Sequence, residues 1–168
     1  MTRTTPWSFY ELFVLPNLGD FLDEPTSIRK SVNAAVSAFQ LADIMYKFYE
    51  QNDPKQIAAW SKQKDFLKFL STREQSFLTI QSVATAYKHL YTNKGFYEIP
   101  SAGDLYTLDV AGAELTQRWG QDAQGQPQHP GDVFVRRRGK SDKSMTAALK
   151  DVVEGMWPTI LPDESGLP

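Results

Sequence analysis

Cysteine is absent from this chain of 168 residues. Its absence excludes a disulfide framework, cysteine-ligated zinc, an iron–sulfur cluster and thiol catalysis. Histidine is scarce as well, since His89 and His129 are the only two and no second ligand stands at the spacing of a metal motif. We therefore expect no metal site.

Long apolar runs are also missing. The only early one, Leu12–Leu15, follows Glu11 and ends at Pro16, so we expect no signal peptide. The longest uncharged helical stretch, Gln75–Tyr87, is too short and too polar to span a bilayer. We expect a soluble, cytoplasmic protein with no membrane contact.

The familiar catalytic and cofactor motifs do not occur. Gly139-Lys140-Ser141 resembles the end of a phosphate-binding loop, but the glycine that such a loop needs five positions earlier is Phe134. The sequence contains neither the glycine-rich dinucleotide fingerprint nor the Gly-x-Ser-x-Gly of hydrolases. We expect no bound cofactor, and the sequence favours a protein without catalytic activity.

What is present is the composition of a globular protein. Hydrophobic residues make up 41% and aromatic residues 12% of the chain, enough for one domain over residues 1–168. The formal net charge of −2 provides no overall attraction to nucleic acid.

The spacing of the apolar residues predicts about five helices in a helical region, residues 8–92, and a closing helix. We expect them over Phe9–Leu15, 26–51, 54–70, 73–91 and 144–157. Pro16 and Pro25 predict a loop after the first helix, and Pro158 predicts the end of the last. The tail, residues 162–168, is expected to be frayed.

The predicted helix over 26–51 has apolar residues on two faces. One stripe includes Val32, Phe39 and Tyr46, and the opposite face of its second half carries Leu41, Ile44 and Phe48. Such a helix is either enclosed in the core or covered by a second subunit. A homodimer is therefore one expectation.

Between the helices, residues 96–138 change character and predict a β insertion. Strands are expected over Phe96–Ile99, Leu105–Val110, Leu115–Trp119 and Asp132–Arg138, with a Gln/Gly/Pro-rich loop over Gly120–Gly131. The predicted fold is thus mainly α (α+β), a helical bundle with a small antiparallel hairpin or meander inserted before the last helix.

One candidate catalytic group lies on the helix predicted over 73–91. His89 lies on the face opposite the main apolar stripe, and Lys88 is its neighbour. If another helix covers that face, the imidazole titrates near neutrality, and Asp43 is the candidate partner that would orient it. The alternative is a structural hydrogen bond between buried polar groups.

A second candidate site is basic. Arg136, Arg137 and Arg138, extended by Lys140, could grip a nucleic-acid backbone beside the aromatic ring of Phe134. The alternative is a charged edge strand that resists aggregation, which the overall negative charge favours.

Two segments carry a family resemblance. Ala34-Ala35-Val36-x-Ala38-Phe39-x-Leu41-Ala42-Asp43 and the later Ala84-x-Ala86-x-Lys88-His89 resemble a group of uncharacterised bacterial helical proteins. That group is distantly similar to the HEPN superfamily, helical bundles that include RNases of toxin–antitoxin and phage-defence systems. The resemblance covers residues 25–92 and the final helix.

The superfamily's active nucleases carry an arginine, four further residues and then a histidine. Here Ala84 stands where that arginine would be, so only His89 matches the motif. The resemblance implies a non-catalytic or diverged member.

Three functions follow from the sequence. The favoured one is a non-enzymatic interaction module that contacts an unidentified protein partner or a second copy of itself. The second is an HEPN-like nucleic-acid-binding or diverged RNase-like protein that uses His89, Lys88 and the basic segment. The third is a small-molecule-binding protein or enzyme with its pocket between the helices and the β element.

Overall fold

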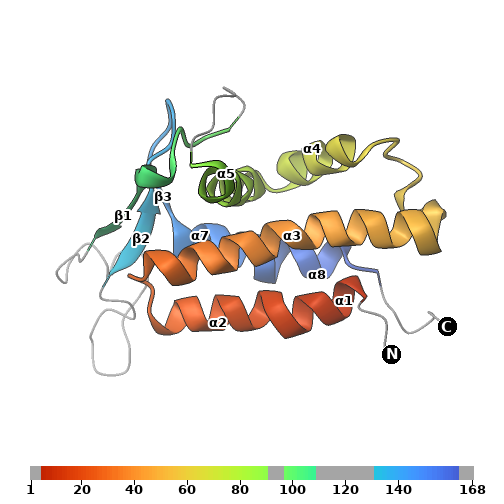
Figure 1. The fold of residues 1–168 in the computed structure, drawn as a ribbon, viewed down its shortest axis with the longest axis horizontal. Helices are drawn as coiled ribbons and strands as arrows, with labels where there is room; N and C mark the ends of the chain where they lie inside the picture. The colour runs from red at the N-terminus through yellow and green to blue at the C-terminus, as the bar shows by residue number, and fades with distance from the viewer. Residues whose placement is uncertain (1–4, 91–96, 109–130, 163–168) are drawn as a thin grey trace.

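The fold is arranged around one long central helix. A computed structural model describes residues 5–90, 97–108 and 131–162 (Figure 1). Helix α3 (Ile28–Asn52) begins at Ser27, whose side chain accepts a hydrogen bond of 3.4 Å from the Lys30 amide. The N-terminal helix lies along one side of α3, α4 and α5 lie along the other, and the sheet lies at one end (Figure 1). The mainly helical fold with a small antiparallel sheet is confirmed.

Small side chains bring the neighbouring helices close to α3. Ala34, Ala35, Ala38 and Ala42 are all buried in the hydrophobic core. The second apolar face is covered within the chain, since Leu41 is fully buried and Phe48 packs partly buried against the core. Ile44, the third residue of this face, is only partly buried, so the chain itself covers two of the three residues.

The N-terminal helix differs from the prediction in length and in its start. It runs through α1 (Pro6–Phe9), the π-helix η1 (Tyr10–Val14) and α2 (Leu15–Asp23). It begins earlier than the predicted start at Phe9, with a capping box between Thr5 and Ser8. The predicted loop after Leu15 was wrong, because the chain stays helical through Pro16, which follows the π-turn and lies in the first turn of α2, where a proline is tolerated.

The helix predicted over 54–70 is two elements. The 3₁₀-helix η2 (Pro54–Ile57) and α4 (Gln63–Arg73) are joined by a non-helical stretch. Helix α5 (Gln75–His89) follows, and it ends where Leu90 has a positive φ of 64°. A residue with positive φ is a common end of an α-helix, because it cannot continue the helical conformation.

The sheet contains only some of the residues that were predicted to form strands. Its order is β1 (Leu105–Leu108), β2 (Asp132–Val135) and β3 (Lys143–Ser144), all antiparallel. The short 3₁₀-helix η3 (Ala102–Asp104) precedes β1.

Three predicted strands differ from the structure or lie beyond it. Residues 97–99, which belong to the first predicted strand, are not in a strand, and β2 ends before the arginines. The strand predicted over Leu115–Trp119 and most of the loop over Gly120–Gly131 lie outside the described residues.

The closing helix extends past its predicted end. It comprises α7 (Met145–Lys150), the π-helix η4 (Asp151–Met156) and α8 (Trp157–Ile160). Pro158 does not stop it, because a π-turn again precedes the proline. The tail predicted to fray lies outside the described residues except for Pro162.

Two long-range hydrogen bonds fasten the ends of the chain to the core. The Tyr10 hydroxyl donates to the Val153 carbonyl at 2.9 Å, and the Trp157 indole donates to the Ala38 carbonyl at 3.2 Å.

None of the helices in the described segments is both long and apolar enough to cross a bilayer.

Candidate functional site

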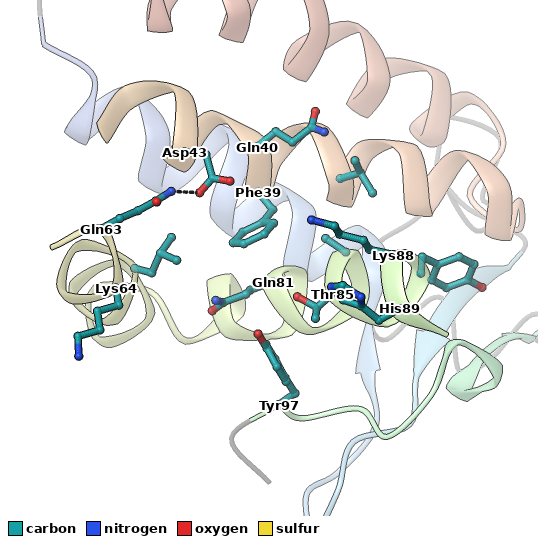
Figure 2. A pocket seen from close by; sticks show the side chains of 14 residues that line it. Phe39, Gln40, Asp43, Gln63, Lys64, Gln81, Thr85, Lys88, His89 and Tyr97 are labelled. Atoms are coloured by element: carbon teal, nitrogen blue, oxygen red, sulfur yellow. Dashed lines mark hydrogen bonds between the residues drawn. The ribbon is translucent and has the colours of Figure 1, made fainter. Parts of the chain in front are cut away.

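A cavity of about 640 Å³ opens between α3, α4 and α5 (Figure 2). Its volume lies within the range of small-molecule sites, roughly 300–1,000 Å³. The central helix contributes Val36, Phe39, Gln40 and Asp43, and the rest of the lining comes from α4, α5 and Tyr97. All three candidate catalytic residues, Asp43, Lys88 and His89, line it.

Residue size on α5 explains why space remains there. Ala84 and Thr85 face the cavity and leave room opposite the Phe39 ring. Phe39 is only partly buried and packs against Phe77, with the ring centres 6.2 Å apart. Phe39 thus separates the cavity from the core that Phe77 belongs to.

Asp43 is held at the α4 end of the cavity. Its half-buried carboxylate accepts a hydrogen bond from the Gln63 side chain (Figure 2). Burial raises the pKa of the Asp43 carboxyl above its usual value, while the Gln63 hydrogen bond and the charges of Lys47 and Lys88 act in the opposite direction. The pKa of this carboxyl therefore reflects a balance between burial, which raises it, and these polar and charged neighbours, which lower it.

Lys88 and His89 lie toward the other end of the cavity, where α5 stops. Both side chains are exposed, and Figure 2 shows Lys88 lying between α5 and α3. The hydrogen bond of Asp43 goes to Gln63 and not to His89, so the imidazole is not oriented by that carboxylate. A catalytic role for these residues stays a prediction.

An unusual buried polar group lies beside the cavity, in the side chain of Gln81. This residue is 4% exposed, and its side-chain oxygen Oε1 has no hydrogen-bond partner. A buried acceptor without a partner costs about 1–3 kcal/mol, so such groups are rare and call for an explanation. Gln81 lines the cavity, but its Oε1 is closed off from the cavity space.

Sequence reasoning missed Gln63 and Gln81. Gln63 lies one residue after a non-helical N-cap, and only the docking of α4 on α3 brings it to Asp43. Gln81 lies between the buried residues Ile80 and Ser82 of α5, and a glutamine within a buried helical segment is the one available signal.

The basic segment is located away from the cavity lining and is largely engaged within the chain. The Lys140 ammonium lies 2.8 Å and the Arg137 guanidinium 3.7 Å from the buried carboxylate of Glu98. The Arg136 guanidinium lies over the Tyr106 ring at 5.4 Å, and the Arg138 amide donates to the Glu98 carbonyl. These contacts give the segment a structural role, and its binding of nucleic acid stays a prediction.

Residues 5–90, 97–108 and 131–162 contain no obvious metal-binding cluster. Within those ranges, no three His, Asp or Glu side chains stand close enough together to hold an ion.

Comparison with known proteins does not assign the chain to a family. No protein-family model matches it, and neither the curated proteins nor the solved structures include a significant match. The HEPN resemblance accordingly stays a prediction.

Proposed function

We propose that this protein binds a small organic molecule in the cavity between α3, α4 and α5. The observation that carries the proposal is the cavity of about 640 Å³ itself, whose lining combines apolar side chains with the half-buried carboxylate of Asp43. A cavity that combines apolar walls with a few convergent polar groups is the usual form of a ligand site. The third function expected from the sequence is thus the best supported, although its pocket lies among the helices.

A thermal-shift screen with a library of small metabolites tests the proposal. A ligand that binds only the folded protein at a concentration of 100 times its Kd stabilises it by about 2.7 kcal/mol. Binding should then shift the NMR methyl signals of Val36, Leu67 and Ala84, which line the cavity. Hits that leave these signals unchanged, or a library without hits, would contradict the proposal.

A cavity-filling variant provides the matched control. Thr85→Phe places an aromatic ring in the cavity and should abolish binding of any hit. Thr72→Phe makes the same change at an exposed position of α4 outside the lining and should leave binding intact. Equal affinity of a hit for both variants would place its site elsewhere.

A homodimer remains the second candidate, on a different surface from the one the sequence indicated. Leu12, Phe13 and Leu15 follow closely along the N-terminal helix and are 65%, 49% and 39% exposed. Exposed apolar patches often mark protein contacts. Light scattering at micromolar concentration tests this, with Phe13→Glu as the disrupting variant; a monomeric wild type would contradict it.

A further inference from the structure

The charged groups in the cavity lining differ in how far water reaches them. Lys64 and Lys88 are exposed, and the Lys64 side chain points away from the cavity in Figure 2. The Asp43 carboxylate, in contrast, is half-buried. Water and salt screen exposed charges strongly, whereas a charge that is partly removed from water acts more strongly on its surroundings. The charge that dominates inside the cavity is therefore negative.

Asp43 has no cationic partner among the residues that the structure describes. The acidic members of the ion pairs there are Glu24, Glu98 and Asp151. One carboxylate oxygen of Asp43, Oδ1, accepts from Gln63, and the other, Oδ2, accepts no hydrogen bond from the described residues (Figure 2). An ionised carboxylate has about four acceptor positions on its two oxygens, so Asp43 keeps acceptor capacity for a ligand.

Burial without a cationic partner has an energetic cost for this carboxylate. Loss of water is the largest influence on the Asp43 carboxyl and raises its pKa, and the charges of Lys47 and Lys88, neither of which pairs with it, oppose this only in part. A buried charge is stable when a charge of opposite sign lies beside it. Binding of a cation at Oδ2 would therefore recover part of the cost.

An aromatic ring lies next to this carboxylate on the same face of α3. Phe39 and Asp43 are four residues apart in the helix, so their side chains are neighbours, and both line the cavity. The face of an aromatic ring attracts a cation within about 6 Å of its centre. Val36 and Leu67 continue the lining with apolar surface. The surroundings of Asp43 thus suit a cationic group that carries an apolar substituent.

From this arrangement we infer that the cavity binds an organic amine, with its protonated amino group on the Asp43 carboxylate beside the Phe39 ring. The apolar body of the amine packs against Val36 and Leu67, and the ligand needs no anionic group. This inference rests on the proposed function, because it names the chemical class of the molecule that the cavity binds.

Calorimetric titration with matched sets of probes tests the inference. Each set carries an amino, a hydroxyl or a carboxylate group on the same apolar body, as in benzylamine, benzyl alcohol and phenylacetate; cyclohexyl and hexyl sets are built in the same way. In at least one set the amine should bind at least about tenfold more tightly than its two analogues, a difference of about 1.4 kcal/mol. The NMR signals of the Gln63 side-chain amide, which donates to Asp43, should shift with the amine and not with the alcohol.

Asp43→Asn tests the carboxylate directly. It keeps an acceptor for Gln63 but removes the negative charge, so the amine should bind no more tightly than the alcohol. Asp20→Asn makes the same change at an exposed position outside the lining and should leave the advantage of the amine intact. If Asp43→Asn does not fold, the Gln63 signals of the wild type still test the contact.

Lys88→Met tests the sign of the charge that the site prefers. Removing a positive charge that acts on Asp43 should strengthen amine binding or leave it unchanged. Lys68→Met makes the same change at an exposed position of α4 outside the lining and should not alter binding. Weaker binding of the amine to Lys88→Met than to Lys68→Met would overturn the inference.

The outcomes separate the class of ligand from the function. Alcohols or carboxylates that bind as tightly as the amines, or sets without amine binding up to millimolar concentration, overturn the amine. If a neutral or anionic metabolite from the screen then shifts the methyl signals of Val36, Leu67 and Ala84, the binding function stands without it. If no metabolite shifts them, both proposals fail.

Discussion

The Lys140 ammonium lies 2.8 Å from the Glu98 carboxylate, and this contact joins the turn after β2 to the segment that precedes η3. The same carboxylate accepts a hydrogen bond from Thr79 of α5, and the Glu98 amide donates to the Ser82 hydroxyl at 3.0 Å. Glu98 is therefore the point where the sheet end of the molecule is fastened to α5. Its neighbour Tyr97 lines the cavity, so this fastening also supports one cavity wall.

Glu98→Ala should lower the free energy of unfolding by about 2–3 kcal/mol, because it leaves the Thr79 hydroxyl and the cations without their acceptor. Urea denaturation measures the change. Lys140→Met is the matched control, since the Lys140 side chain is 53% exposed and its loss should cost less than about 1 kcal/mol. Equal effects of the two substitutions would contradict a central role for Glu98.

Asp132 should make stability depend on pH in a defined direction. Its buried carboxylate accepts from the Ser144 and Thr146 hydroxyls, yet burial raises its pKa above the usual value of about 3.9. A carboxyl with a raised folded-state pKa contributes stability that is complete below its unfolded pKa and is lost as pH rises through the folded one.

The Asp132→Asn variant isolates this contribution. The unfolding free energy of the wild type, minus that of the variant, should fall as pH rises from about 4 to 7, because the asparagine does not titrate. Urea denaturation at several pH values measures the difference, in which the titration of other carboxyls cancels. A difference that rises with pH would show that the hydrogen bonds outweigh burial.

Phe77→Ala should destabilise the protein more than Phe39→Ala. Phe77 is fully buried and packs edge-on against Trp157, so we expect a cost of about 3–5 kcal/mol. Phe39 is only partly buried beside an existing cavity, and its removal should cost about 1–3 kcal/mol. Thermal unfolding checks the order, and a larger cost at position 39 would mean that this ring belongs to the main core.

Tyr10→Phe should cost about 1 kcal/mol, because it leaves the buried Val153 carbonyl without its donor. Tyr106→Phe is the comparison, since the Tyr106 hydroxyl donates to the exposed Asp142 and water can replace it. Chemical denaturation should show a clear loss only for the first. The same small loss in both variants would mean that the contact between Tyr10 and the closing helix adds little.

The amphipathic helices were the part of the fold that the sequence predicted well. The stripe of α3 follows the period of 3.6 residues, because this helix buries a continuous face. The closing helix was also predicted, although its π-turn departs from that period. The two π-turns could not be anticipated, since proline after an apolar run usually ends a helix, as Pro16 and Pro158 were expected to do. The β3 residues Lys143 and Ser144 form a strand only because β2 lies beside them.

The helical spacing in the sequence was enough to propose that Asp43 and Lys88 lie near each other, and both line the cavity. It was not enough to predict their hydrogen-bond partners. Whether Asp43 pairs with His89 or with Gln63 depends on the angle at which α4 packs, which is a tertiary property. The unpartnered oxygen of Gln81 is also invisible in a sequence, because it depends on what the surrounding helices leave empty.

The π-helices η1 and η4 each hold a residue more than the α-helical turn they replace, so both helices can shorten by one residue and remain helical. Removing one residue inside η1 would convert the wide turn into an α-helical one and would keep the residues on either side of it on the same faces, because the wide turn only absorbs the extra residue. Removing one residue from the α-helical part, inside α2, would instead rotate everything before it by about 100° relative to the rest of α2 and would turn Tyr10 away from Val153. The two π-turns are therefore the places where each of these helices tolerates a change in chain length.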